Sequence, residues 1–373
     1  MDPRTETAPS ETDPSPAHGR LRVAIAVTPD QSVPPTYDGN AHRLTAALAE
    51  TLTEAGHLPM LIGAAAPRLE VDQVPVHRPP MQSRADMLAA LEQAILTHLH
   101  RFDVLHVHHA PSPDLTEAVE DAGIAAFRWL HRFDEAGATP EPWTVVRTHP
   151  DIATGSDADT TVLPGILASR FHLTSGADGY CALYGDLSDL DAAQRACDMA
   201  RLNRMVVKMG GGNALDGPFR KRQFERLRKP RSPTAVQEQG AMIASQRQFL
   251  FGNAAVALFT LPGNAFDVSL LEAMACGTPV VVFGVPAMEQ FVEEGVTGYV
   301  ARDAEGAVTA LAKARHLDRR AIRARFEERW TARRMMEEAM GLAPGARNGS
   351  ADSPLSSHGR GRHADATQLT AAE

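Results

Sequence analysis

Short apolar runs alternate along the chain with longer segments in which apolar residues recur at helical spacing. The first apolar run, at 22–27, is followed by a turn-rich loop at 28–40 and a periodic helix that ends at Gly56. A second apolar run at 57–62 comes next. Strand, glycine-containing loop, helix and strand in this order open a doubly wound α/β domain, whose ligands bind at the carboxyl ends of the strands. The pattern therefore predicts a parallel sheet with a ligand site beside its first loop.

The same alternation continues through most of the chain. Before residue 150 it predicts helices at 87–99 and 115–122 and strands at 102–109, 124–130 and 143–148. After residue 178 it predicts strands at 179–185, 205–209, 254–259 and 280–283, and helices at 192–202, 218–227, 239–251, 304–314 and 319–340. Strands alternating with helices in both parts predict two α/β halves.

Composition narrows the class of protein. With 373 residues, of which 43% are hydrophobic, the chain can bury two cores of ordinary domain size. A net charge of −9 argues against a nucleic-acid partner held by phosphate contacts. Three scattered cysteines without metal-ligand spacing indicate a reducing, cytoplasmic environment. The chain has no apolar run of about 18 residues and no apolar signal-peptide core near Met1, so we expect no membrane span.

The most informative stretch is 264–283. An apolar stripe at helical spacing ends at Gly277, and Pro279 precedes the β-branched run at 280–283. The stretch predicts a loop, a helix, a tight stop and a buried strand. Glu272 then lies about one turn into a helix whose start attracts anionic ligands, and Asp267 can cap that start.

This stretch resembles the nucleotide-sugar signature of retaining glycosyltransferases with the GT-B fold, in sequence family four (the group 1 glycosyltransferases). The family pattern is Glu-x7-Glu, with Ala-Met-Ala-Cys-Gly-Thr-Pro-Val after the second Glu. The sequence keeps the second Glu as Glu272 and the block after it, but has Asn264 at the first position. The resemblance covers about 22–341 and includes further matches at 32–58, 102–131, 289–300 and 325–330.

The resemblance implies an α/β protein with two Rossmann-like domains that face a central cleft. We expect an N-terminal acceptor-side domain at 21–165 and a C-terminal nucleotide-sugar domain at 166–318. A C-terminal helix at 319–341 is expected to pack back on the first domain. The polar, Pro- and Ser-rich ends at 1–20 and 342–373 are expected to be disordered tails.

The implied activity is transfer of a hexose from a nucleoside diphosphate sugar to an acceptor, with retention of configuration at the anomeric carbon. A small-molecule acceptor, such as a natural product, suits the absence of a membrane patch. In the family the second Glu, here Glu272, binds the ribose hydroxyls, and a strand-end histidine matching His131 lies beside the donor sugar. The resemblance and the sequence pattern together give three sets of site residues: catalytic, His131 and Asn264; donor-binding, Gly39, Gly185, Lys208, Gly211, Asp267 and Glu272; acceptor-binding, Asn40, His108 and His109.

A metal site is not expected. His106 and His108 share one face of a predicted strand, but no carboxylate or cysteine is suitably spaced to complete a metal site. The family needs no protein-bound metal, so no cofactor is expected beyond the substrate nucleotide-sugar, and Mg²⁺ is not required.

The sequence departs from the family where the donor phosphates bind. Aligned on Gly185, the positions that hold Arg and Lys in the family are Asp186 and Asp191, and Asp38 and Asp267 replace glycines. Carboxylates beside a diphosphate repel it by an energy on the order of 1 kcal/mol each.

Three interpretations stay open. The enzyme is active and holds the phosphates through other groups: Lys208, Arg220, Lys221 and the loop 210–212. Alternatively it is a catalytically silent partner or activator of another enzyme. In the third, it takes an unusual donor, or binds diphosphate through a divalent ion bridging aspartates. The sequence does not identify the base, the sugar, the acceptor or the oligomeric state, and a homodimer is compatible with it.

Overall fold

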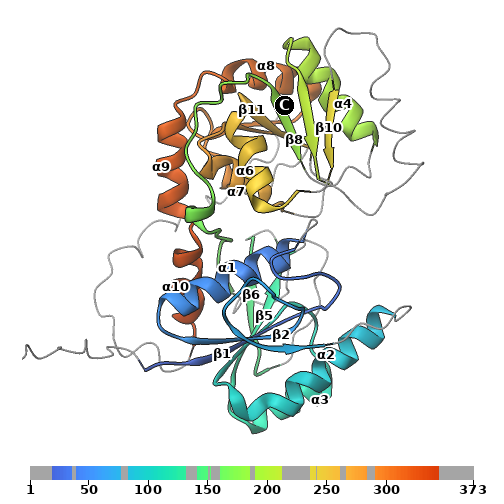
Figure 1. The fold of residues 1–373 in the computed structure, drawn as a ribbon, viewed down its shortest axis with the longest axis vertical. Coiled ribbons are helices and arrows are strands. Elements are labelled where there is room, and N and C mark those ends of the chain that lie inside the picture. Colours follow the sequence, from blue (N-terminus) through green and yellow to red (C-terminus); the bar gives the residue numbers. More distant parts are fainter. Residues whose placement is uncertain are drawn as a thin grey trace, which may run out of the picture.

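The computed structural model of the chain shows two α/β halves, one above the other in Figure 1. It describes residues 19–35, 39–76, 83–131, 141–149, 152, 160–184, 190–211, 236–240, 242–260, 266–283 and 290–343.

The first half is built on a seven-stranded parallel sheet with the order β3-β2-β1-β4-β5-β6-β7. Its strands are β1 (Arg22–Val27), β2 (Leu58–Gly63), β3 (Asp72–Pro75), β4 (Val104–Val107), β5 (Ala125–Leu130), β6 (Thr144–Arg147) and β7 (Thr160–Thr161). Its helices are α1 (Asn40–Glu54), α2 (Arg84–His98), the short η1 (Leu99–Arg101) and α3 (Pro113–Asp121).

Side chains alternate between the two faces of this sheet. In β1, Val23 and Ile25 pack toward α1, whereas Ala24 and Ala26 pack toward α2 and α3. Both faces of β1 are buried, which explains its unbroken apolar sequence.

The second half has a six-stranded parallel sheet with the order β10-β9-β8-β11-β12-β13. Its strands are β8 (Cys181–Tyr184), β9 (Val207–Gly210), β10 (Val236–Gly240), β11 (Val256–Phe259), β12 (Val280–Phe283) and β13 (Gly298–Ala301). Helices α4 (Leu190–Leu202) and α8 (Ala304–Ala314) pack on one face, and α6 (Ala244–Asn253) and α7 (Ser269–Ala275) on the other.

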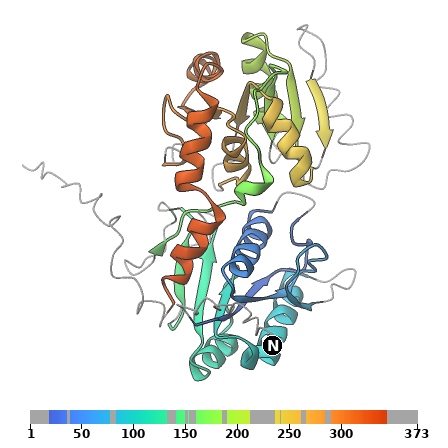
Figure 2. The ribbon, with the colours of Figure 1, turned by 60° about the vertical axis from the view of Figure 1, so that its left-hand side comes forward.

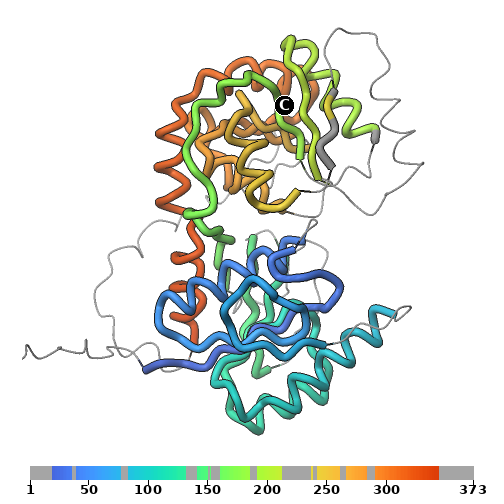
Figure 3. The backbone as a smooth tube through the Cα atoms, in the orientation of Figure 1, coloured from blue at the N-terminus to red at the C-terminus, as the bar shows by residue number. Residues whose placement is uncertain are grey.

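The chain passes between the halves at two adjacent places. The first crossing runs through Ile166 into the short helix η2 (Ala168–Arg170), and the second joins α9 (Arg319–Arg329) to α10 (Ala332–Met340). Ile166 N–H donates to the Trp330 carbonyl at 3.0 Å, and Ala332 N–H donates to the Ile166 carbonyl at 2.8 Å. Figure 3 shows the two crossings side by side, and Figure 2 shows α10 beside α1.

The predicted fold class, two doubly wound α/β units, is confirmed. The helix predicted at 239–251 was wrong at its start, because 236–240 pairs with β9 as an edge strand and α6 begins only at Ala244. The helix predicted at 319–340 is interrupted at 330–331, where the backbone bonds to Ile166 instead. The edge strands β3 and β7 were not predicted, and the helix predicted at 218–227 lies outside the described residues.

Among the described helices, none combines the length and the apolar character that crossing a lipid bilayer requires.

Candidate functional site

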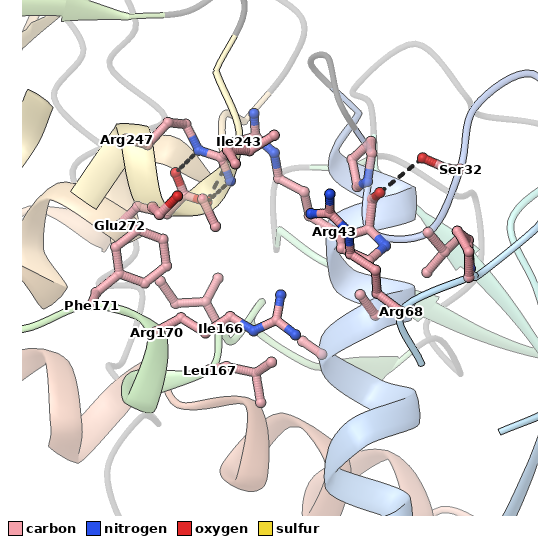
Figure 4. A pocket seen from close by; sticks show the side chains of 18 residues that line it. Ser32, Arg43, Arg68, Ile166, Leu167, Arg170, Phe171, Ile243, Arg247 and Glu272 are labelled. Carbon is pink, nitrogen blue, oxygen red and sulfur yellow. Dashed lines mark hydrogen bonds and ion pairs between the residues drawn. The ribbon is translucent and has the colours of Figure 1, made fainter. Parts of the chain in front are cut away.

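A cleft of about 290 Å³ lies between the two halves. It is bounded by the segments that follow β1, β2 and β10, together with α1, α6, α7 and the first crossing (Figure 4). The carboxyl ends of strands from both sheets therefore meet at this cleft, which is where ligands bind in open parallel sheets. Its described lining residues are Ser32, Val33, Pro34, Pro35, Arg43, Ala46, Ala47, Pro67, Arg68, Ile166, Leu167, Arg170, Phe171, Ile243, Ala244, Ser245, Arg247 and Glu272.

Glu272 forms a bidentate ion pair with Arg247 in the wall of the cleft. Arg247 Nε donates to Glu272 Oε2 at 2.5 Å and Nη2 donates to Oε1 at 2.7 Å, as Figure 4 shows. The side chains are only 4% and 3% exposed. Arg247 Nη1 also donates to the Met242 carbonyl at 2.6 Å. Two parallel bonds and burial hold the Glu272 carboxylate in one orientation.

Glu272 is held ionised by its neighbours. Burial alone would raise the pKa of this carboxyl, but attraction to Arg247 and Arg43 and the Arg247 hydrogen bond lower the pKa below its ordinary value. For the Arg247 guanidinium, burial opposes the charged form, and the nearby Glu272 more than offsets this, so the pKa is raised.

Arg43 reaches from the first half into the same cluster. Its Nη1 donates to Ser269 Oγ at 2.8 Å and lies 3.9 Å from Glu272 Oε1 and 3.8 Å from Asp267 Oδ1. Its guanidinium carbon lies 5.8 Å from the centre of the Tyr184 ring. The side chain is 5% exposed, so Arg43 is a buried polar bridge between the halves.

Both arginines occupy the first turn of a helix. Arg43 is the fourth residue of α1 and Arg247 the fourth residue of α6. A positive charge is unfavourable at the positive end of the helix dipole. The nearby carboxylate of Glu272 compensates for this in the folded chain.

Asn40 and Asp267 shape the contact between α1 and α7. The Asn40 amide donates to the Phe266 carbonyl and its Oδ1 accepts from the Val268 N–H at 3.1 Å. Asp267 Oδ1 accepts from the Ser269 N–H at 2.8 Å, a bond of the kind that caps a helix start. The acceptor-binding residue predicted at 40 thus contacts the backbone of the other half, and part of the Asp267 charge is taken up locally.

A chain of histidines lies at the carboxyl ends of β4 and β5. His131 Nε2 and His108 Nδ1 share a hydrogen bond of 2.7 Å, and His108 Nε2 lies 3.1 Å from Thr45 Oγ1 in α1. Burial lowers the pKa of His131 to about 4, with a further contribution from His42, and lowers that of His108 well below its ordinary value. These imidazoles are neutral at pH 7, so they act as hydrogen-bonding groups without charge.

The remaining histidines of the cluster have other contacts. His106 is fully buried, accepts from Trp129 Nε1 at 2.8 Å and stacks on Phe127, and burial lowers its pKa to about 3. His109 Nε2 lies 3.0 Å from Glu92 Oε1. Among the described residues no group of three or more His, Cys, Asp or Glu side chains is arranged to hold a metal ion.

The predicted donor-binding residues that the structure describes do not lie together at one site. Lys208 pairs with Asp178 at 3.3 Å, lies 3.8 Å from the Tyr180 ring centre, and lines a separate cavity of about 250 Å³. Gly39 precedes α1 and Gly211 follows β9 with a φ of 105°. Asn264 and Gly185 lie outside the described residues, as does Asp186.

Of the predicted residues that the structure describes, only Glu272 lines the cleft. His131, His108 and His109 lie at the same edge of the first sheet but do not line this cavity. The sequence reasoning missed Arg43, Arg68, Arg170 and Arg247. The position of Arg43 soon after the loop at 28–40 was a signal that it has a compensating partner, whereas the helix predicted from residue 239 placed Arg247 beyond the first turn.

The chain is similar to known proteins both in sequence and in fold. Residues 187–316 match the family model described as glycosyl transferases group 1. No curated protein matches the sequence. AviGT4, a glycosyltransferase involved in Avilamycin A biosynthesis, superposes with a TM-score of 0.65 at 20% identity, covering 86% of this chain and 96% of that one.

Two further solved structures share the architecture. Sucrose-phosphate synthase from Thermosynechococcus elongatus has a TM-score of 0.67 at 14% identity, covering 87% of this chain and 98% of its own. The Anabaena protein HepE, solved with UDP-glucose, has a TM-score of 0.64 at 14% identity, covering 86% and 98%.

The chain therefore has the two-domain α/β architecture of the GT-B fold. Within that fold, the match to the group 1 glycosyltransferase model covers residues 187–316.

Proposed function

We propose that the protein is a glycosyltransferase that moves a sugar from a nucleoside diphosphate sugar to a small-molecule acceptor, with retention of anomeric configuration. The observation that carries the proposal is the buried, oriented carboxylate of Glu272 at a cleft where the carboxyl ends of two parallel sheets meet. HepE, which shares the fold, is described in complex with UDP and with UDP-glucose.

Glu272 supplies the nucleoside contact in this proposal. Each carboxylate oxygen has two acceptor positions. The Arg247 bonds occupy one on each oxygen, so the ribose hydroxyls of a donor take the other. Because Arg247 fixes the carboxylate before the ligand arrives, little side-chain entropy is lost on binding.

The first half supplies the acceptor side. His131 and His108 follow β5 and β4, at the same carboxyl edge as the loop after β1 that lines the cleft. A neutral imidazole at His131 suits a hydroxyl group of a sugar or an acceptor, since it donates and accepts hydrogen bonds without a charge. Both ring nitrogens of His108 face protein partners, His131 and Thr45, so His108 orients His131. The natural-product type of acceptor is supported by the role of AviGT4 in Avilamycin A biosynthesis.

Thermal stability in the presence of nucleotides tests the donor site. Purified protein is heated with UDP, GDP, ADP, dTDP or CDP, with and without Mg²⁺, and the Glu272→Ala variant is the control for each. A nucleotide present at a hundred times its dissociation constant adds about 2.7 kcal/mol to the stability of the folded state. A rise in Tm for one base, absent in the variant relative to its own Tm, supports the proposal.

The product tests the chemistry. With the donor class known, NMR of the glycoside formed shows whether the anomeric configuration of the donor is kept. Inversion refutes retention. No stabilisation by any nucleotide refutes the donor site and favours a catalytically silent partner, whereas stabilisation only with Mg²⁺ favours a metal-bridged diphosphate.

A further inference from the structure

The cleft contains more positive than negative charge. Its described lining includes four arginines, Arg43, Arg68, Arg170 and Arg247, against the single carboxylate of Glu272. A nucleoside diphosphate brings a diphosphate with several charged oxygens, for which guanidinium groups are well-matched partners. The arginines that can bind this diphosphate are those with N–H donors that are not already used within the protein.

Two of the four are committed within the protein. Arg247 donates its hydrogen bonds to Glu272 and to the Met242 carbonyl. Arg43 is held by Ser269 beside Glu272 and the Tyr184 ring, and it is 5% exposed. Neither has freedom to turn toward a ligand without breaking buried contacts.

The other two are available. Arg68 follows β2, is exposed, and has no hydrogen bond or ion pair with any residue that the structure describes. Arg170 in η2 is 33% exposed and forms an ion pair through Nη2 with Glu50 of α1. A guanidinium has five N–H donors, so one such pair leaves Arg170 donors for a ligand. Figure 4 shows both side chains beside the same hollow as Glu272.

The second half offers little in their place. Among its described residues that line the cleft, Arg247 alone is cationic. Lys208 is held by Asp178 and Tyr180 at a different cavity. Asp267 and Asp191 on this half carry carboxylates, which repel a diphosphate.

We propose, resting on the proposed function above, that Arg68 and Arg170 bind the diphosphate of the nucleoside diphosphate donor from the first half and the first crossing. The nucleoside is held by Glu272 on the second half, so the donor spans the cleft. This division makes the two parts of the ligand separable: the arginines recognise the diphosphate and do not affect the nucleoside.

The experiment measures the affinity of a nucleoside and of its diphosphate by calorimetry, using uridine and UDP or the pair for the base that raises Tm. The ratio of the two affinities isolates the contribution of the phosphates. The variants are Arg68→Gln, Arg170→Gln and the double variant. Arg315→Gln is the matched control, since Arg315 is exposed beyond α8, away from the cleft, and has no partner among the described residues.

Each cleft substitution is expected to lower the ratio roughly tenfold, the effect of one charge-assisted hydrogen bond, and to leave nucleoside affinity unchanged. The control keeps the wild-type ratio. Glu50→Gln removes the carboxylate that competes for Arg170, so it is expected to raise the ratio.

A wild-type ratio in the double variant overturns the inference. So does loss of inorganic phosphate binding in that variant while the ratio is kept, because the arginines then serve an anionic group other than the donor diphosphate. If the wild-type protein binds no nucleotide at all, the proposed function fails together with the inference. The other two outcomes refute the inference alone, because in them the wild-type protein still binds the nucleotide.

Discussion

The buried cluster around Glu272 gives the sharpest prediction for stability. Glu272→Gln keeps the shape of the side chain but removes the negative charge that faces Arg247 and Arg43. Breaking one partner of a buried ion pair costs about 3–5 kcal/mol, because the remaining charge stays buried without compensation. Here two guanidinium groups are left, so we expect the upper part of that range.

Arg247→Gln is expected to cost less. Glu272 then still has Arg43 at 3.9 Å, and two charges near 4 Å attract each other by about 4 kcal/mol at an effective dielectric of 20. The structure therefore predicts an order, with the Glu272 variant less stable than the Arg247 variant. The double variant Arg247→Met, Glu272→Leu is expected to lose less than the sum of the two single changes.

Differential scanning calorimetry suits this test, since the two halves can unfold in separate transitions. A loss of 3–5 kcal/mol lowers Tm by roughly 10 °C in a domain of this size. The shift should occur in the transition of the second half, which contains both residues. Trp129 and Trp143 lie in the first half and Trp330 lies at the crossing, so tryptophan fluorescence in a Trp330→Phe background serves as the internal control. Additive single losses, or a Glu272→Gln cost below about 1 kcal/mol, would refute the reasoning.

Three further predictions follow from other parts of the molecule. Burial lowers the pKa of His131 to about 4 from 6.5, so the unfolded chain takes up the proton first. The contribution of His131 to stability is then full above pH 6.5 and falls as pH decreases toward 4. His131→Asn should make a plot of Tm against pH less steep in that window, while His106 and His108 keep their own contributions. Gly165→Ala places a Cβ 2.2 Å from the Thr331 carbonyl oxygen, so we expect a loss of about 1–3 kcal/mol in thermal unfolding. Burial raises the pKa of Cys276 to about 12, and the described thiols are all buried, so a thiol-reactive dye should label the native protein far more slowly than the denatured chain.

Local sequence patterns predicted the helices and strands whose structure is determined by residues close together in the chain. The stop after α7 is an example, since Gly277 adopts a φ of 71° and its Cβ position lies 2.6 Å from the Arg319 carbonyl. Only glycine fits there, and the apolar run that follows forms β12 with both faces buried. Such elements are specified by a few neighbouring residues.

Elements that depend on distant partners were not predictable in the same way. The edge strand β10 is polar and becomes a strand only by pairing with β9. The interruption of the last helix at Trp330 depends on Ile166, which lies far away in the sequence. The cleft itself rests on Arg43, Arg247 and Glu272, which no local spacing connects. Glu272 was found because its flanking residues match a family pattern, whereas its arginine partners have no such motif.

The two crossings between the halves form a single mechanical joint. Ile166 and Thr331 pair as a parallel bridge, so neither crossing can slide past the other. A relative motion of the halves that keeps this bridge is therefore a rotation about it. Asn40, which clasps the backbone before α7, is a latch across the opening. Rotation about the joint would therefore have to break the Asn40 contacts together with the Arg43 bond to Ser269, which also crosses between the halves.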